Sequence, residues 1–196
     1  DRIFIDGLGG MAQGLFATLI IGTIIQQIGL FMGGGTGDLI YELGKIAAGL
    51  TGAGIGVGVA RKLEAGHLVI VSAAVVGMIG AFAGKILSGQ VLVDGNLVLA
   101  GPGEPLGAFA AAYLAIEIGI LISGKTKLDI ILTPLVCIGT GSAVGLFVGP
   151  PISEFMLWLG SLINWGTEQQ PFLMGIVVSV LMGMILTLPI SSAALG

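Results

Sequence analysis

Long apolar runs alternate with short polar breaks along this chain, and the length of the runs predicts membrane-crossing helices. The hydrocarbon core of a bilayer is about 30 Å thick, and a helix crosses it in about 20 residues at about 1.5 Å per residue. The runs predict six crossings, at roughly Leu8–Met32, Asp38–Ala60, His67–Leu87, Leu106–Ile122, Asp129–Val148 and Pro171–Leu188.

The polar breaks predict the structure between the crossings. The glycine-rich stretch Gly33–Gly37 predicts a flexible break after the first run. Within the polar interval Ser88–Glu104, apolar triplets at Val91–Val93 and Leu97–Leu99 flank Asp94-Gly95-Asn96, which predicts a small β-hairpin. The sequence Gly149-Pro150-Pro151 predicts the end of the fifth crossing, because proline cannot donate the next helix hydrogen bond.

One apolar stretch is too short to cross a membrane. Ile152–Trp165 has apolar residues at helical spacing, with Glu154, Ser161 and Asn164 between them and two tryptophans present. This pattern predicts an amphipathic helix that lies at the membrane interface or re-enters the membrane.

The composition supports an integral membrane protein. Hydrophobic residues make up 55% of the 196 residues and charged residues only 9%, whereas a soluble domain carries about 25% charged residues. The predicted fold class is all-α integral membrane: about six transmembrane helices, one amphipathic or re-entrant helix and a small extracellular β-hairpin. Residues 1–196 are expected to form a single transmembrane domain, the N-terminal portion of a longer protein.

The basic residues predict the orientation in the membrane. Arg61 and Lys62 follow the second crossing, and Lys125 and Lys127 follow the fourth, so the two basic loops lie on the same side. Loops rich in Lys and Arg are cytoplasmic as a rule. The hairpin and the amphipathic helix then lie outside, and both ends of this chain lie in the cytoplasm of a bacterial cell, whose inner membrane is the expected location.

Glycine pairs four residues apart predict close helix packing. Gly52/Gly56, Gly54/Gly58 and Gly141/Gly145 each place small residues on one helix face. The run Gly52–Gly58 does not match the spacing of a dinucleotide-binding loop, and no strand precedes it. Nucleotide binding is therefore not predicted, and the net charge of −4 gives no reason to expect nucleic acid.

Candidate site residues are the polar groups at membrane depth or beside it. Glu117 is an acid inside the fourth crossing, where it is expected to face other helices or water. It either contacts a ligand or cation, or it is a packed acid that is hydrogen-bonded to a neighbour such as Tyr113. For the polar cluster Thr167–Gln170, after the amphipathic helix, the alternatives are contact with a substrate and a solvated loop. The candidate substrate-binding residues are Glu117, Tyr113, Glu104, Asn164, Glu168, Gln169 and Gln170.

No catalytic centre, cofactor or metal site is predicted. The single histidine, His67, stands at the start of a crossing, and no Ser–His–Asp or Cys–His arrangement can form around it. The single cysteine, Cys137, is expected to be a small buried hydrophobic residue. No spacing typical of zinc, haem or iron–sulfur ligands is present. Glu42 and Lys45 lie three apart on one helix face and are expected to pair.

Several motifs resemble the membrane IIC component of bacterial sugar phosphotransferase systems. They are GPGEPLGAF at Gly101–Phe109, LISGKTKLD at Leu121–Asp129, GPP at Gly149–Pro151, and the stretch Trp158–Leu188. The chain is similar to the fructose-type group, and closer to the IIC-like family that contains the clostridial toxin-gene regulator. The resemblance implies a polytopic, usually dimeric protein that binds a sugar, moves it inward and passes it to a cytoplasmic IIB domain.

The leading hypothesis is therefore a IIC-like permease subunit for a small polar solute, expected to be a sugar, with membrane lipid, a second copy and a IIB protein as partners. Two family signatures are missing: the segment Thr187–Ser192 differs from the fructose-type pattern, and a Gly-Ile-Thr-Glu sequence is absent. They motivate an alternative, a non-transporting membrane sensor or regulator. A third hypothesis, a lipid-binding membrane scaffold, rests on the glycine-rich apolar faces.

Overall fold

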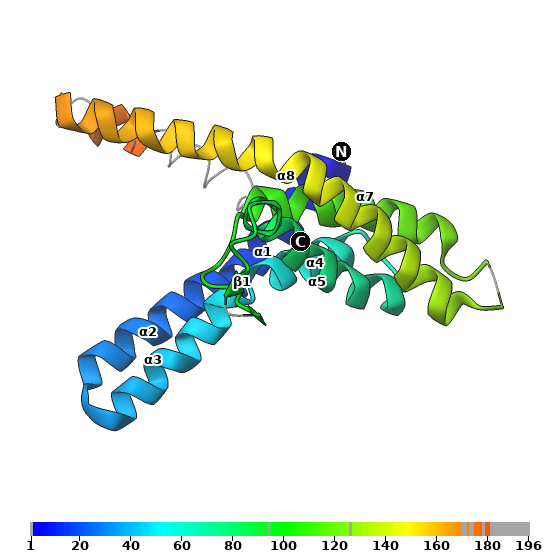
Figure 1. The fold of residues 1–196 in the computed structure, drawn as a ribbon, viewed down its shortest axis with the longest axis horizontal. Coiled ribbons are helices and arrows are strands. Elements are labelled where there is room, and N and C mark those ends of the chain that lie inside the picture. Colours follow the sequence, from blue (N-terminus) through cyan, green and yellow to red (C-terminus); the bar gives the residue numbers. More distant parts are fainter. Residues whose placement is uncertain are drawn as a thin grey trace.

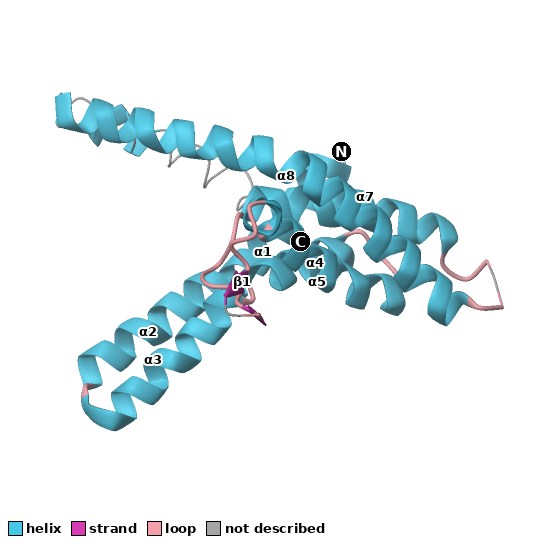
Figure 2. Cartoon of the chain, viewed as in Figure 1, coloured by secondary structure: helices cyan, strands magenta, loops and turns pink. Residues whose placement is uncertain are grey.

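The computed structural model of the protein describes residues 2–93, 95–125 and 127–169, together with positions 172, 175–177 and 179–180. Most of the described chain is helical, and two very short strands lie between α6 and α7 (Figure 2). The elements are η1 (Arg2–Gly7), α1 (Leu8–Leu15), η2 (Phe16–Ile20), α2 (Ile21–Met32), α3 (Gly34–Gly49), α4 (Thr51–Lys62), α5 (His67–Ala81), α6 (Ala83–Leu87), β1 (Leu92–Val93), β2 (Asn96–Leu97), α7 (Pro105–Ile122) and α8 (Asp129–Gln169).

The first predicted crossing forms one long helix. Ile5–Met32 is helical over 28 residues and is apolar enough to cross a bilayer, although its turns widen to π-helical geometry at η1 and η2. The helix ends at Gly33, whose φ of 62° is a conformation that glycine adopts without steric cost. The predicted flexible break over Gly33–Gly37 is wrong in extent, because α3 begins at Gly34.

The second predicted crossing is bent. The helices α3 and α4 meet at Leu50 at an angle of 50°, whereas the sequence pattern predicted one span over Asp38–Ala60. The hydroxyl of Thr51 spans this bend and donates to the carbonyl oxygen of Ala48 at 2.6 Å. Thr51 is fully buried, and a hydroxyl bonded to a preceding carbonyl is a known cause of helix bending.

Glycines bring α4 close to the helices on both sides, as the four-residue spacing predicted. Gly52 and Gly56 abut α5, and a methyl group placed on Gly52 would lie 2.6 Å from the carbonyl oxygen of Gly77. Gly54 and Gly58 face the opposite side and abut the glycines of α1. The backbones therefore approach within a distance that no larger side chain would permit, which is the packing expected of small residues in membrane helices.

The third glycine pair has the same role on α8. A methyl group on Gly145 would lie 3.2 Å from the Cβ atom of Ala111, and one on Gly141 would lie 2.7 Å from the Cβ atom of Ala115. Both alanines belong to α7 and are buried. Cys137 is buried on the same helix, as the sequence predicted.

The third predicted crossing is interrupted. The helix α5 covers 15 residues and is apolar but shorter than a full span, and α6 adds five residues after a break at Phe82. Beyond it, β1 and β2 pair antiparallel, with Leu92 opposite Leu97 and Val93 opposite Asn96. The strands have two residues each, where three were predicted, and Asn96 belongs to a strand rather than to the turn. Their location outside the membrane stays a prediction.

The helix α8 corrects two predictions. It runs for 41 residues through Gly149-Pro150-Pro151, which therefore does not end the fifth crossing. Ile152–Trp165 is the continuation of this helix and not a separate amphipathic helix. Proline can occupy a helix because its fixed φ near −65° is helical, although two hydrogen bonds to earlier carbonyls are lost.

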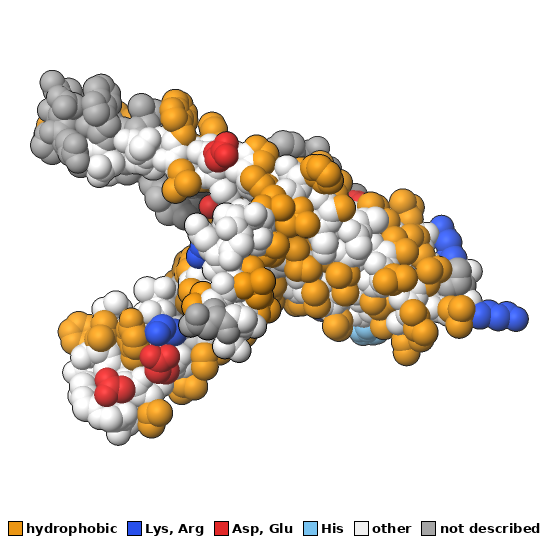
Figure 3. Space-filling view, in the orientation of Figure 1, with side chains coloured by type: hydrophobic (Ala, Val, Ile, Leu, Met, Phe, Trp, Pro, Cys, Tyr) orange, Lys and Arg blue, Asp and Glu red, His pale blue; other side chains and the backbone are white. Residues whose placement is uncertain are grey.

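The described elements form a body with two projecting arms (Figure 1). The helices α1, α4, α5, α7 and the first half of α8 pack together around buried residues that include Ile55, Val59, Val69, Phe82 and Ile116. The α2–α3 hairpin and the second half of α8 extend away from this body (Figure 1). Apolar side chains cover much of the visible surface (Figure 3), which suits contact with lipid.

Three helices of the described chain are long and apolar enough to cross a membrane: Ile5–Met32, Pro105–Ile122 and Asp129–Ser161. A fourth is added if α3 and α4 together make one bent crossing. The third predicted crossing is not among them, because α5 ends at Ala81 after 15 residues. The sixth, Pro171–Leu188, lies mostly outside the described residues.

Candidate functional site

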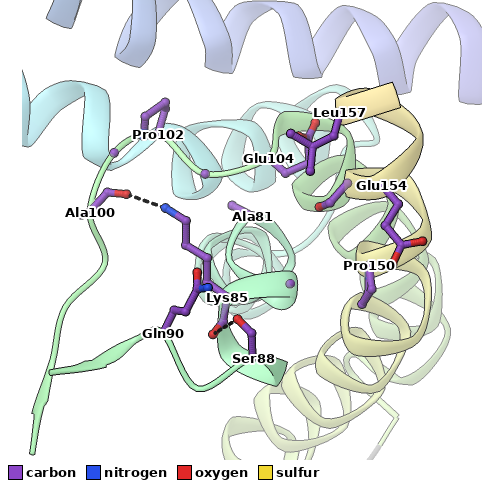
Figure 4. Close-up of a pocket in the computed structure, with 14 residues that line it drawn as sticks. Ala81, Lys85, Ser88, Gln90, Ala100, Pro102, Glu104, Pro150, Glu154 and Leu157 are labelled. Carbon is purple, nitrogen blue, oxygen red and sulfur yellow. Dashed lines mark hydrogen bonds between the residues drawn. The ribbon is translucent and has the colours of Figure 1, made fainter. Parts of the chain in front are cut away.

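A cavity of about 600 Å³ lies where the loop before α7 meets α6 and the middle of α8 (Figure 4). Three segments line it: the end of α5 with α6 and the turn after it, the loop leading to α7, and the part of α8 that starts at its proline pair. The lining residues are Ala81, Gly84, Lys85, Ser88, Gln90, Ala100, Gly101, Pro102, Gly103, Glu104, Pro150, Ser153, Glu154 and Leu157.

Lys85 fastens the loop to α6. Its Nζ atom donates a hydrogen bond to the carbonyl oxygen of Ala100 at 3.1 Å (Figure 4), and it lies 5.4 Å from the centre of the Phe82 ring. The hydroxyl of Ser88 donates to the backbone oxygen of Lys85 at 3.2 Å. The ammonium group keeps two further donors, since a lysine carries three.

Glycine brings the loop against α5. Gly103 has a φ of 71°, and a methyl group on it would lie 2.8 Å from the carbonyl oxygen of Ala81. Next to it, the backbone N–H of Glu104 donates to that same oxygen at 2.7 Å. The sequence Gly103-Glu104-Pro105 therefore fixes both the start of α7 and the direction in which Glu104 enters the cavity wall.

Glu104 is a half-buried acid at the N-terminal end of α7. Its carboxylate forms no capping hydrogen bond with the helix. Burial raises the pKa of Glu104 above its ordinary value of 4.5, and the nearby backbone N–H of Leu106 opposes part of that rise. A carboxylate has two oxygens with several lone pairs, so Glu104 has acceptor capacity left for a ligand.

The cavity thus combines an apolar lining with few polar groups. Glu154, on α8, is a lining residue that is exposed to solvent, and its carboxylate is turned away from Lys85 (Figure 4). Ser153 adds a hydroxyl to the lining. Among the described residues, no ion pair joins Lys85 to Glu104 or Glu154. Separate donors and acceptors suit a ligand with several hydroxyl groups, whereas no group of three metal-ligating side chains converges in the described chain.

The structure brings one predicted site residue to this cavity, Glu104. Tyr113 and Glu117 lie further along α7, about 14 and 20 Å from Glu104 by helical rise. Both are partly buried and interact with neighbouring groups. The ring of Tyr113 lies 5.8 Å from that of Phe109.

The other predicted site residues lie on the distal part of α8. Asn164 is exposed there, two turns beyond Leu157, and it has an interaction of its own. The side chains of Glu168 and Gln169, and the whole of Gln170, are outside the described residues. Glu42 and Lys45 form the predicted pair at 3.4 Å, but on the α2–α3 arm.

The sequence analysis missed Lys85, Ser153 and Glu154 as cavity residues. A signal existed for Lys85, which is the only basic residue between the two basic loops. Glu154 lies three residues after Pro151, but the expectation of a helix end at Gly149–Pro151 assigned it to a separate interfacial helix. Only the continuity of α8 places its first turn after the prolines against α6 and the loop before α7.

The raised pKa of Glu104 predicts a pH dependence of stability. A carboxyl group whose pKa is higher in the folded protein stabilises it fully below the ordinary value of 4.5, and this contribution is lost as the pH rises through the folded pKa. We therefore expect Glu104→Gln to have a higher melting temperature than the wild type at neutral pH, with the difference shrinking toward pH 4.5. The melting temperatures of both proteins are measured in detergent across this pH range. A difference between them that does not change with pH would contradict the expectation.

Comparison with known families agrees with the membrane architecture. The family model described as phosphotransferase system, EIIC matches residues 5–196, which is nearly the whole chain. No curated protein and no solved structure matches the chain at a significant level. The family confirms the resemblance to IIC components, while the fructose-type and toxin-regulator detail stays a prediction. With its long apolar helices, this chain is a multi-pass membrane protein that belongs to the phosphotransferase system EIIC family.

Proposed function

We propose that this protein is a sugar-permease membrane subunit that binds its solute in the cavity between α6, the loop before α7 and α8. Membership of the EIIC family indicates a membrane subunit of sugar transport. The observation that carries the site is a cavity of about 600 Å³ whose lining includes the charged residues Lys85, Glu104 and Glu154. Small-molecule sites have volumes of about 300–1,000 Å³ and a few polar groups on apolar walls.

The chemistry of the lining supports a polyhydroxylated solute. The carboxylates of Glu104 and Glu154 accept hydrogen bonds from hydroxyl groups, and the ammonium group of Lys85 donates them. Ala81, Pro150 and Leu157 supply apolar surface for the carbon face of a sugar ring. The solute class that fits is a monosaccharide or a hexitol.

The cavity lies at the end of α7 opposite to the basic loop that carries Lys125 and Lys127. We place that basic loop in the cytoplasm, by the preference of Lys and Arg for this side. The cavity and the β1–β2 pair then lie toward the outer face of a bacterial inner membrane, and both ends of this chain lie inside. We further propose a homodimer and a cytoplasmic IIB protein as partners, which the family supports.

The test compares substitutions in the cavity lining with one on the α2–α3 arm. The full-length protein in proteoliposomes is screened for binding of radiolabelled monosaccharides and hexitols, and the tightest binder is kept as the probe. We expect Glu104→Gln and Lys85→Gln each to weaken binding about tenfold, because a hydrogen bond to a charged group contributes about 1.5–3 kcal/mol. Glu42→Gln, on the exposed α2–α3 arm, is the matched control and should leave affinity unchanged.

Glu117→Gln decides between the cavity and the mid-helix acid that the sequence suggested. Weakened binding in Glu117→Gln, with Glu104→Gln unaffected, would move the solute site to the middle of α7. Binding without saturable uptake by the wild-type protein would favour the sensor or regulator function over transport. Retention of lipid but of none of the solutes would favour the lipid-binding scaffold.

A further inference from the structure

Four of the seven Lys and Arg residues gather at the end of the body away from the cavity. Arg61 and Lys62 form the last turn of α4, and Lys125 and Lys127 belong to the loop between α7 and α8. The two loops are neighbours, since a methyl group on Gly66 would lie 3.4 Å from the hydroxyl of Ser123. Basic side chains stand out at this end in Figure 3, where Figure 1 shows the α7–α8 loop.

Asp129 holds the α7–α8 loop in place. One of its carboxylate oxygens, Oδ1, accepts hydrogen bonds from the backbone N–H of Gly124 at 2.9 Å and from the hydroxyl of Thr133 at 2.6 Å. Gly124 has a φ of 77°, which turns the chain sharply after α7. The carboxylate of Asp129 is thus hydrogen-bonded within the loop, whereas Lys125 and Lys127 are exposed.

The positive charges of these four basic side chains are available to an anionic ligand. Within the described residues, none of them forms an ion pair with a carboxylate. Glu64, in the α4–α5 loop, and Asp129 are the acids on the same two loops, so cations outnumber acids there. This excess distinguishes the end from the whole chain, whose net charge is −4.

Exposed apolar side chains border the same loop. Leu121, Leu128, Ile130 and Ile131 are each about two-thirds exposed. They lie at the ends of α7 and α8, where membrane helices leave the hydrocarbon. A cation beside an exposed aliphatic side chain matches a phospholipid, whose phosphate lies next to its acyl chains, better than it matches a soluble acidic protein.

We propose that Arg61, Lys62, Lys125 and Lys127 form a binding surface for the phosphate headgroups of anionic phospholipids, with the acyl chains against Leu128 and Ile131. The surface does not depend on the solute site, because it lies at the opposite end of α7. Juxtamembrane basic residues bind anionic lipid by charge attraction, and each contributes separately.

The test uses the full-length protein in a mild detergent with phosphatidylglycerol as the probe. Phosphatidylglycerol is expected to raise the melting temperature of the wild type, and phosphatidylcholine is not. In Lys125→Gln/Lys127→Gln the apparent affinity for phosphatidylglycerol should fall about tenfold. Lys125→Arg/Lys127→Arg keeps the charge and should behave as the wild type. Lys45→Gln, which removes a cation on the α2–α3 arm, is the matched control.

Three results would overturn the proposal. The first is an unchanged response to phosphatidylglycerol in the double glutamine variant. The second is an equal stabilisation by inorganic phosphate at the same concentration, which would make the surface a site for free phosphate. The third is a double variant that keeps the lipid response but loses binding of a soluble IIB protein, which would assign the surface to a protein partner.

Discussion

Gly56→Leu is expected to abolish the accumulation of folded protein. A Cβ atom at position 56 would collide with the backbone oxygen of Ala73 on α5, and backbone cannot move aside as the tip of a side chain can. Adding even one methyl group to a packed core typically costs about 1–3 kcal/mol, and leucine adds four carbon atoms. The measurement is the monodisperse fraction of the detergent-solubilised protein in size-exclusion chromatography, with Gly56→Ala expected to give an intermediate result.

Gly139→Leu is the matched control for this substitution. Gly139 also lies in a helix, α8, but a Cβ atom there would have nothing within 4 Å in the described structure. Gly139→Leu removes a glycine from a membrane helix without forcing two backbones apart, so this variant should remain monodisperse. Equal losses in Gly56→Leu and Gly139→Leu would mean that α4 and α5 do not pack as described.

The double substitution Pro150→Ala/Pro151→Ala is expected to stabilise the protein. The two prolines cannot donate hydrogen bonds to the carbonyl groups of Leu146 and Phe147, four residues earlier in α8. A proline inside a helix costs up to about 3 kcal/mol relative to alanine. We therefore expect a higher melting temperature in detergent for the double variant than for the wild type.

Pro105→Ala is the control for the proline pair. Pro105 is the first residue of α7, where an N–H group would have no helical partner, so its replacement should bring no comparable gain. A less stable Pro150→Ala/Pro151→Ala variant would contradict the expectation. Pro150, Ser153 and Leu157 line the cavity. If the protein has the proposed function, we therefore also expect the double variant, with its more rigid α8, to take up solute more slowly than the wild type.

The pattern of the sequence predicted the helices whose boundaries depend on local chemistry. The long apolar helix up to Met32 and the helix that begins at Pro105 follow from hydropathy and from the residues that end or start a helix. The glycine faces of α4 and α8 were also predictable, because residues four apart lie on one face whatever the rest of the fold does. Glu104 was a candidate for the same local reason, as an acid at a helix start.

The residue pattern alone therefore predicts a glycine-packed, helical membrane protein with basic loops. The tertiary structure decided the bend at Leu50, the break at Phe82 and the passage of α8 through its two prolines, because each depends on which side chain or helix lies alongside. It also decided the cavity, since Lys85, Glu104 and Glu154 belong to different elements and line one cavity only because α8 continues past Pro151 beside α6. Hydropathy measures transfer into lipid one segment at a time, and it contains no term for this contact between segments.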